Sequence, residues 1–219
     1  RTLFNGQYTR TASYFSNSDL ASSGLPEGEE LKLLEQYRSR VPERVFTDEF
    51  QPPVTDGSGR PRENLRAAAA LLEAAGWEIR DLKLVNVETA EPMVFEILLY
   101  SPAFERIVLP FTRNLEQLGI EASIRLVDQT QYINRFREKD FDMLVWTWGE
   151  SETPGNEQRG YWGTDAADAT GSRNLAGIKD PVVDELIELL VMSESREQLN
   201  VRTRALDRVL LWGFYVIPQ

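Results

Sequence analysis

The 219-residue chain contains no cysteine and no histidine. The absence of cysteine excludes disulfides, thiol catalysis and thiolate metal sites. The absence of histidine excludes the Ser-His-Asp and Cys-His mechanisms and the usual zinc sites. Carboxylate and lysine chemistry remain available to the chain, so composition alone leaves part of the enzyme repertoire open.

Positive charge is scarce, because 24 Lys and Arg face 35 Asp and Glu, which gives a formal net charge of −11. Phosphate backbones are bound by clustered Lys and Arg, so the sequence predicts no nucleic-acid partner. Anionic lipid surfaces are disfavoured for the same reason. No apolar run reaches the roughly 18–20 residues of a membrane-spanning helix. Neither a GxGxxG nor a Walker sequence occurs, and no cofactor or metal is predicted.

The two ends of the sequence are unusual. The chain begins at Arg1 without an initiator Met or a signal peptide, and it stops at Gln219 just after the strand-like apolar run WGFYVIP. Natural chains seldom end within a strand, because their termini are generally polar and exposed. We therefore expect this sequence to be a fragment of a longer protein.

Residues 1–60 are rich in Gly, Pro, Ser and Asn, which favour turns and irregular structure. A short helix is expected after Pro26, because the apolar residues of LKLLEQY recur at helical spacing. The DGSG run at 56–59 predicts a turn, since it lacks the alternating acids of a calcium loop. We expect this segment to pack over a core formed by residues 61–219.

Helical and strand patterns alternate from residue 61 onward. The order β-α-β-α-β with short joints predicts an open α/β sheet with helices on both sides. Right-handed crossovers make such strands largely parallel. The expected elements are a helix ENLRAAAALLEAAG closed by Gly76, a short strand KLVN, a strand at 93–100, a helix AFERIVLPFTRNLEQLG with a kink or late start at Pro110 and an end at Gly119, a strand IEASIRLVD, a helix QTQYINRFREKD and a strand FDMLVWTWG.

The last third combines an irregular stretch with two expected helices. Residues 149–177 show no periodicity and are rich in Gly, Asn and Trp. Asp180 and Pro181 form an N-cap and first-turn pair before VVDELIELLVM. SREQLNVRTRALDRVLLW follows with apolar residues at helical spacing. The preceding strand, FDMLVWTWG, reads as a central strand buried on both faces.

The segment 146–174 has the most functional composition in the chain. Ligands of open α/β sheets bind beyond the carboxyl ends of the strands, which is where this segment is expected. Its aromatic and charged residues suit a zwitterionic ligand such as a peptide. The candidate ligand-binding residues are Trp146, Trp148, Glu150, Ser151, Glu152, Asn156, Arg159, Trp162, Arg173 and Asn174.

Plain structural roles compete with ligand contact at these positions. Trp146 fits core packing better than ligand contact, because it alternates with Trp148 along the strand. Each glutamate of the segment fits a solvated loop charge. Arg159 and Arg173 suit the carboxylate of a ligand, yet an ion pair with an acid of the same segment satisfies a guanidinium equally well.

The order of these segments resembles the family 5 extracellular solute-binding proteins, and within them the oligopeptide and microcin C binding branch (the YejA type). The resemblance covers essentially the whole chain. It is carried by LFNGQYTRTASYFSNSDLASSGLPEGEELKLLE, PVTDGSGRPRENLRAAAALLEAAGW, FEILLYSPAFERIVLPFTRNLEQLGIEASIRLVDQTQYINRFREKDFDMLVWTWG, SETPGNEQRGYWG and ALDRVLLWGFYVIPQ.

This resemblance implies a non-enzymatic, two-lobed periplasmic receptor that closes on a peptide or peptide-like ligand and delivers it to an inner-membrane ABC permease. The chain would be the C-terminal lobe, with a type II periplasmic-binding-protein fold, and its N-terminal lobe would be missing. Family members that bind ordinary oligopeptides place an Asp in the matching loop, where it pairs with the peptide amino group. The stretch GESETPGN has Ser151 near that position, with Glu150 and Glu152 beside it.

Two other classes of function stay open. A carboxylate-based hydrolase of envelope glycans or peptides would use one carboxylic acid as proton donor and one carboxylate as its partner. An acid of raised pKa in the loop, together with substrate turnover, would favour it. A scaffold domain of an envelope complex would lack a deep cleft lined by residues 146–174.

Overall fold

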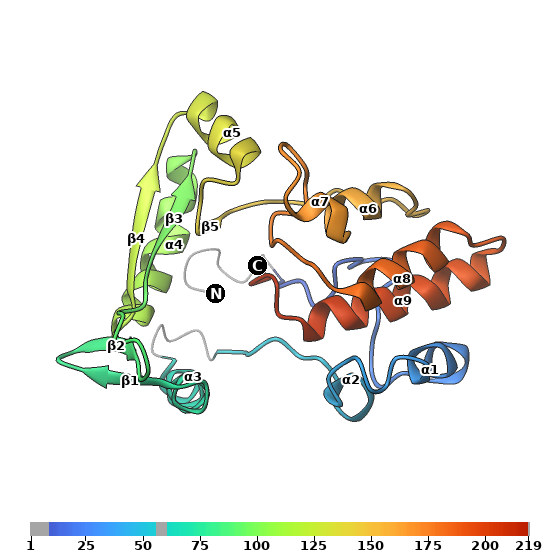
Figure 1. Ribbon diagram of the computed structural model, residues 1–219, viewed down its shortest axis with the longest axis horizontal. Coiled ribbons are helices and arrows are strands. Elements are labelled where there is room, and N and C mark those ends of the chain that lie inside the picture. The colour runs from blue at the N-terminus through green and yellow to red at the C-terminus, as the bar shows by residue number, and fades with distance from the viewer. Residues whose placement is uncertain (1–8, 56–60, 219) are drawn as a thin grey trace. The chain divides into compact units, whose positions relative to one another are not determined.

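The structure is a computed structural model that describes residues 9–55 and 61–218 (Figure 1). The turn predicted at 56–59 lies outside the described residues, as does the beginning of the segment predicted to be irregular. Two compact units account for the described residues. Unit 1 consists of residues from 53–147, and unit 2 consists of residues 9–52 and 148–218. The structure thus groups residues 9–52 with the end of the chain.

In the described part of unit 1, a parallel sheet has three strands in the order β4-β3-β5 (Figure 1). β3 (Val94–Leu99) pairs with both β4 (Glu121–Leu126) and β5 (Met143–Leu144). α4 (Pro102–Glu116) connects β3 to β4, and α5 (Gln129–Glu138) connects β4 to β5. The predicted helix and strand order and the predicted parallel pairing are confirmed.

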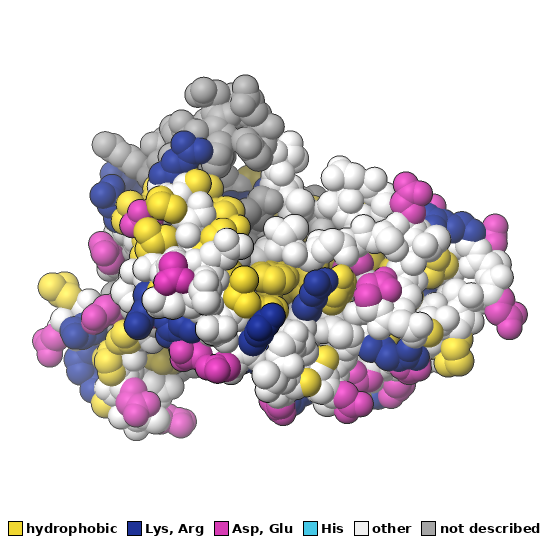
Figure 2. Space-filling view, turned by 90° about the horizontal axis from the view of Figure 1, so that it is seen from above, with side chains coloured by type: hydrophobic (Ala, Val, Ile, Leu, Met, Phe, Trp, Pro, Cys, Tyr) yellow, Lys and Arg dark blue, Asp and Glu magenta, His cyan; other side chains and the backbone are white. Residues whose placement is uncertain are grey.

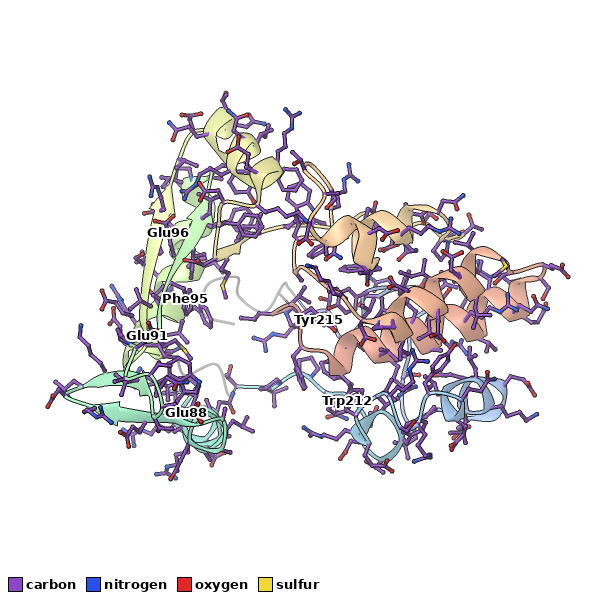
Figure 3. The ribbon with its side chains drawn as sticks, viewed as in Figure 1. Glu88, Glu91, Phe95, Glu96, Trp212 and Tyr215 are labelled. Atoms are coloured by element: carbon purple, nitrogen blue, oxygen red, sulfur yellow. The ribbon has the colours of Figure 1, made fainter. Side chains whose placement is uncertain are left out.

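The two faces of β3 meet different helices, because side chains alternate along a strand. Phe95 and Ile97 pack with Val108 of α4. Glu96, which points to the other face, forms an ion pair with Arg135 of α5 at 3.1 Å (Figure 3). The helices therefore cover opposite faces of the sheet, as right-handed crossovers require.

β5 differs from its prediction. The run FDMLVWTWG was expected to form a long central strand buried on both faces, but β5 has two residues, both half-buried, and β3 is the middle strand. The ladder ends early because the hydroxyl of Tyr132 on α5 donates to the carbonyl oxygen of Val145 at 2.6 Å. A side chain thus takes the hydrogen bond that a neighbouring strand would have made.

A kink or a late start of the helix was expected at Pro110, and the late start is wrong. α4 begins at Pro102, where the side chain of Ser101 caps the backbone N–H of Ala103 at 3.4 Å. Pro110 lies within the helix on its exposed side, so water can reach the carbonyl that a proline leaves without a donor. Gly119 follows the helix with a φ of +77°, a conformation that favours glycine.

A helix and a hairpin precede the sheet. α3 (Arg62–Ala74) is followed by Gly76, whose φ is +82°, so the predicted helix and the glycine after it are confirmed. The predicted strand KLVN is β2 (Lys83–Asn86). It pairs with an antiparallel strand β1 (Trp77–Arg80), which the sequence analysis did not predict.

Unit 2 is helical and surrounds an apolar core. Leu34, Trp162, Leu186 and Leu206 are completely buried there. Both predicted helices after residue 177 are confirmed, and Asp180 caps the first by accepting from the N–H of Val182 at 2.8 Å. The helices of unit 2 are α1 (Gly28–Glu35), α2 (Arg44–Thr47), α6 (Glu157–Trp162), α7 (Thr164–Ala167), α8 (Pro181–Val191) and α9 (Arg196–Trp212).

Two segments of unit 2 differ from their predictions. The stretch 149–177 was expected to be irregular, but it contains α6 and α7. The run WGFYVIP was expected to be a strand, but its first residue, Trp212, ends α9 and residues 213–218 form no strand. The helix continues to Trp212 because Val209, Leu210 and Leu211 are all buried in the core with it.

Buried charges attach the irregular segment 9–30 to α9. The carboxylate of Asp207 accepts from the backbone N–H groups of Tyr14 and Ser22, both at 2.8 Å, and burial raises its pKa. The guanidinium of Arg208 pairs with Glu30 at 2.7 Å and donates to the carbonyl of Gly24 at 2.8 Å. These contacts explain how a segment with little regular structure packs against a helix nearly 200 residues later. No helix in the described residues is both long and apolar enough to span a bilayer.

Candidate functional site

The segment 148–174 of unit 2 begins with an aromatic cluster. Trp148 is half-buried, and its indole N–H donates to the carbonyl oxygen of Arg173 at 3.0 Å. Its ring lies 4.9 Å from that of Trp162, which is completely buried and meets Tyr14 edge-on at 4.9 Å. Trp148 and Tyr14 are therefore the partly buried members of a cluster around Trp162, which belongs to the core.

Glu150 lies against this cluster with its two carboxylate oxygens in different surroundings. Oε2 accepts from the side-chain amide of Gln158 at 2.6 Å. Gln158 is completely buried, and its own Oε1 accepts from the indole N–H of Trp162 at 2.9 Å. Because Trp162 can only donate, it fixes the orientation of the amide and turns the NH₂ group toward Glu150. Glu150 Oε1 is buried and has no hydrogen-bond partner among the described residues.

The electrostatics of Glu150 follow from this arrangement. Burial raises the pKa of the Glu150 carboxyl to about 7, and the nearby charges of Glu157 and Asp207 add to the increase. The hydrogen bond from Gln158 acts in the opposite direction. A carboxyl group in this state has two uses near neutral pH: it donates a hydrogen bond when protonated, and it pairs with a cation when ionised.

Arg173 is the second charged group beside the aromatic cluster. Its guanidinium is exposed, and Nη1 donates to the hydroxyl of Tyr161 at 3.3 Å. Tyr161 in turn donates to the carbonyl oxygen of Gly149 at 3.3 Å. Among the described residues no carboxylate pairs with Arg173, so its charge is available to an anionic group. Asn174, by contrast, is completely buried and holds the backbone of Gly163 and Ile178 through hydrogen bonds of 2.9 Å.

The remaining candidates of the segment make contacts within unit 2. Arg159 pairs with Glu188 of α8 through two hydrogen bonds of 2.6 Å and also contacts Asn156, so its ion pair lies outside the segment's own acids. Ser151 is exposed and accepts from the N–H of Thr153 at 3.2 Å. These contacts order the segment, and a ligand contact at each position stays a prediction.

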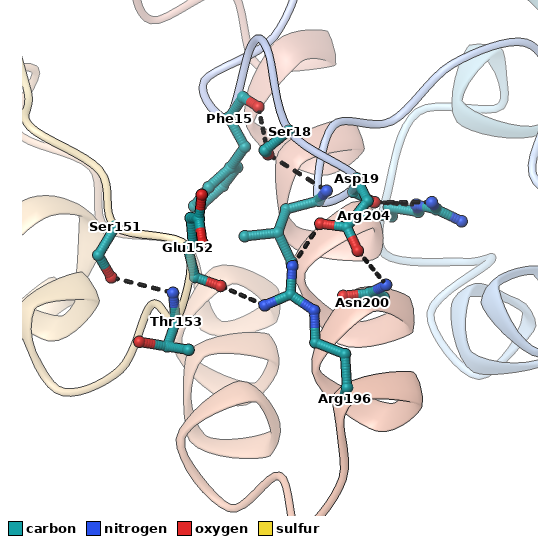
Figure 4. Close-up of polar contacts among 10 residues, drawn as sticks. Phe15, Ser18, Asp19, Ser151, Glu152, Thr153, Arg196, Asn200 and Arg204 are labelled. Atoms are coloured by element: carbon teal, nitrogen blue, oxygen red, sulfur yellow. Dashed lines mark hydrogen bonds and ion pairs between the residues drawn. The ribbon is translucent and has the colours of Figure 1, made fainter.

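Glu152 connects the segment to the rest of unit 2 (Figure 4). Its backbone carbonyl accepts from the guanidinium of Arg196, which also pairs with Asp19. Asn200 donates to the same carboxylate at 2.9 Å, and Arg204 donates to the Asp19 carbonyl. The hydrogen bond from Arg196 lowers the pKa of Asp19. Arg196 thus fixes the backbone two residues after Glu150.

Trp146 belongs to unit 1, whereas the other candidates belong to unit 2. Its ring is stacked on Phe136 of α5 at 4.6 Å with an angle of 10° between the planes. This contact agrees with the packing role that the alternation along the strand favours. The predicted site is therefore divided between the two units, and Trp148 to Asn174 form its unit 2 part.

Sequence reasoning missed three residues of the site: Gln158, Tyr161 and Arg196. Gln158 and Trp162 are four residues apart, the spacing at which side chains meet on a helix, so recognising EQRGYW as helical would have suggested their contact. Arg196 lies 44 residues from Glu152, so no local sequence pattern predicts the hydrogen bond between them.

The chain matches the bacterial extracellular solute-binding proteins, family 5 middle, over residues 1–170. It belongs to this family. The protein y4wM of Sinorhizobium fredii is 52% identical over 218 residues, covering 100% of this chain and 33% of y4wM. The probable peptide-binding protein YejA of Agrobacterium fabrum is 47% identical over 219 residues, covering 100% of this chain and 36% of YejA. The resemblance noted in the sequence is thus confirmed.

A solved structure of the family shows the same fold. The oligopeptide-binding protein AppA of Bacillus subtilis, in complex with a nonapeptide, matches with a TM-score of 0.63 at 16% identity. The match covers 86% of this chain and 38% of AppA. The chain spans about a third of the length of the curated relatives that it matches.

Proposed function

We propose that this chain is part of the periplasmic substrate-binding component of an ABC transporter, and that it binds peptides or peptide-like compounds through their amino group. Family membership supports the transport role, and the Agrobacterium relative is described as a probable peptide-binding protein. The observation that carries the ligand class is the buried Oε1 of Glu150, a carboxylate oxygen without a partner among the described residues. Because this oxygen is buried, neighbouring side chains must move before a ligand reaches it, and an ammonium group then supplies the donors and the charge that it lacks.

The other groups around Glu150 suit the rest of such a ligand. Trp148 presents a partly exposed ring for apolar side chains, and Arg173 presents a guanidinium for a carboxylate. In the full-length receptor, a second lobe would close over the bound ligand and complete the contacts. Binding of the ligand then favours the closed receptor, because the ligand contacts both lobes only in the closed state. The inner-membrane permease would receive the closed form. Ligands of the microcin C type belong to the same chemical class.

Glu150 also meets one condition for the rival hydrolase, because its pKa is raised. The second acid that such an enzyme needs would be Asp207, whose charge Glu150 senses. Asp207 is completely buried, and hydrogen bonds from Ser22 and Tyr14 occupy both of its oxygens. The arrangement therefore favours ligand binding over bond cleavage. Intact recovery of a bound peptide after incubation with the protein, checked by mass spectrometry, would agree with this conclusion.

Titration calorimetry of the full-length protein tests the proposal. The probes are alanine peptides of two to five residues and the same peptides with an acetylated amino end. Wild-type protein should bind at least one free peptide and bind its acetylated form at least tenfold more weakly. Glu150→Gln should lose affinity for the free peptide to a similar degree, because a neutral amide cannot neutralise the ammonium.

The matched control is Glu194→Gln, which removes an exposed charge of unit 2 outside the candidate residues and should leave the affinity unchanged. Failure of all the peptides to bind would overturn the peptide assignment. Equal affinity of wild type and Glu150→Gln for a free peptide would remove Glu150 from the site. Native mass spectrometry of protein purified from its periplasm would then show which compounds it carries.

A further inference from the structure

The loop that carries Glu150, residues 149–154, has an irregular backbone. None of its residues belongs to a helix or a strand, and in the described part of the chain its backbone forms no hydrogen bond with another backbone group. A backbone of this kind takes several conformations unless side chains hold it, and each conformation moves the carboxylate that it carries. The position of Glu150 therefore depends on the side chains that reach this loop.

Two side chains hold the loop backbone on either side of Glu150. The hydroxyl of Tyr161 donates to the carbonyl oxygen of Gly149, one residue before Glu150, at 3.3 Å. The guanidinium of Arg196 donates to the carbonyl oxygen of Glu152, two residues after it (Figure 4). Because Arg196 is the first residue of α9, the second contact attaches the loop to a helix that is largely buried in the core of unit 2.

Asp19 orients the guanidinium that makes this second contact. One carboxylate oxygen of Asp19 pairs with Arg196, and the other accepts from Asn200 at 2.9 Å (Figure 4). The backbone carbonyl of Asp19 accepts two hydrogen bonds from Arg204, at 2.6 and 2.9 Å. The three donors lie four residues apart on α9, the spacing at which side chains share one face of a helix. Since α9 fixes Asp19 at several atoms, the carboxylate can hold the planar guanidinium in one orientation.

Solvent exposure limits what this ion pair contributes to stability. The side chains of Arg196 and Asp19 are 40% and 52% exposed, and exposed ion pairs contribute little to the free energy of folding. Acidic and basic side chains also lie next to one another at several places on the face seen in Figure 2. Arg196 differs from an ordinary surface cation because the same guanidinium holds a loop carbonyl. Its main effect should therefore be on the position of the loop.

We propose that Arg196 and Asp19 are positioning residues for ligand binding: Asp19 orients Arg196, and Arg196 holds the loop so that the carboxylate of Glu150 stays where the ammonium group of a ligand meets it. This inference rests on the proposed function. Neither residue has to contact the ligand, since both act through the backbone at Glu152. A carboxylate that is already in position does not have to be ordered on binding, so the pair increases the affinity without adding a contact.

Titration calorimetry of full-length variants measures this effect with the free and acetylated alanine peptides described above. Arg196→Gln and Asp19→Ala should each bind the free peptide about threefold to tenfold more weakly, the equivalent of one hydrogen bond. Their melting temperatures should stay within about 3 °C of wild type. The acetylated peptide lacks the ammonium group, so its affinity should change less and the preference for a free amino end should decrease.

Two further variants test whether Asp19 acts through Arg196. The double variant Asp19→Ala/Arg196→Gln should bind the free peptide no more weakly than Arg196→Gln alone. Arg196→Lys should keep part of the affinity, because an ammonium group reaches the same oxygens without the fixed geometry of a guanidinium. The matched control is Glu29→Ala, which removes an exposed ion pair with Lys32 on α1 of the same unit and should leave the affinity unchanged.

NMR titration of the Glu150 carboxyl in the ligand-free protein separates this inference from the proposed function. The wild-type group should titrate with a pKa of about 7, because it is buried. Arg196→Gln and Asp19→Ala should lower this pKa toward the ordinary value of a glutamate, since a loosened loop admits water to the carboxylate.

The possible contrary results have different meanings. Wild-type affinity for the free peptide in both Arg196→Gln and Asp19→Ala would overturn the inference, as would an equal loss for the free and acetylated peptides. A loss confined to Arg196→Gln would remove Asp19 from the pair. If wild type binds no peptide, the proposed function fails and the titration decides alone. A lowered Glu150 pKa in the variants would then support the positioning role, and an unchanged pKa would overturn it too.

Discussion

Glu150 and Asp207 lie close enough in unit 2 for the charge of Asp207 to raise the pKa of the Glu150 carboxyl. The first residue belongs to the segment after unit 1, and the second lies on α9. Hydrogen bonds stabilise the two carboxylates to different extents. Asp207 receives several hydrogen bonds, while one oxygen of Glu150 receives none from the described residues. Glu150 is therefore the acid that a proton or a ligand cation can stabilise most.

The stability of the ligand-free protein should depend on Glu150 between pH 4.5 and pH 7, its ordinary and its raised pKa. In this window the folded state keeps a proton that the unfolded state releases, so stability falls as pH rises. Glu150→Gln should remove this part of the slope. The variant should be more stable than wild type by roughly 1–3 kcal/mol above pH 7 and by almost nothing near pH 4. Urea unfolding at several pH values measures the difference, and parallel curves would contradict it.

Replacing Gln158 by leucine should destabilise unit 2 by about 2–4 kcal/mol, because two buried polar groups lose their partner. These groups are the Glu150 carboxylate and the Trp162 indole N–H. Gln36→Leu, a change at an exposed position of the same unit, should alter stability by less than about 0.5 kcal/mol. Chemical denaturation of both variants provides the comparison. If Gln158→Leu lost as little stability as Gln36→Leu, water would have to replace the hydrogen bonds that Gln158 makes.

Removing the charge of Arg208 should cost about 3–5 kcal/mol, since Glu30 would be left buried without its partner. Arg208→Met provides this change with similar side-chain length. The double variant Glu30→Leu/Arg208→Met should regain part of the loss, because no buried carboxylate remains. It should not regain all of it, as Gly24 also loses a hydrogen bond to its carbonyl. A double variant less stable than Arg208→Met would contradict this explanation.

Comparing Gly119→Ala with Gly171→Ala separates two costs of replacing glycine: backbone strain at positive φ and a steric clash of the new Cβ. Both residues have positive φ, +77° and +75°. A Cβ at Gly119 would lie 2.6 Å from the backbone nitrogen of Leu84, whereas nothing lies within 4 Å of one at Gly171. Both variants should lose about 1–2 kcal/mol from backbone strain, and Gly119→Ala should lose clearly more because residues 82–84 of the hairpin must move. Equal losses in thermal unfolding would show that the hairpin adapts freely.

Elements with strong periodicity were predictable from the sequence, and those fixed by distant contacts were not. The apolar spacing along α9 and the capping pair before α8 gave both helices correctly. β5 was overestimated, because its apolar run does not reveal that Tyr132 ends the ladder. α6 was missed, since six residues are too few for a periodic signal.

In the candidate site, too, local patterns were predictable from the sequence and distant contacts were not. Composition pointed to the segment 148–174 as a candidate, yet it did not separate Trp148, which is partly exposed, from Trp162, which is completely buried. That distinction depends on which side of α6 faces the core. The raised pKa of Glu150 depends on its burial and on its neighbours Gln158 and Asp207. Asp207 lies 57 residues after Glu150 in the chain. Local sequence patterns do not predict a contact between residues so far apart in the chain.

The hydrogen bond between Tyr14 and Asp207 joins residues separated by 193 positions, and unit 1 lies between them in the chain. During synthesis the first part of unit 2 therefore leaves the ribosome long before the helix that holds it, while unit 1 is complete. In pulse-labelled hydrogen exchange, amides of unit 1 should gain protection before those of residues 9–30. Until α9 has been synthesised, residues 9–30 cannot form these contacts and stay accessible to chaperones.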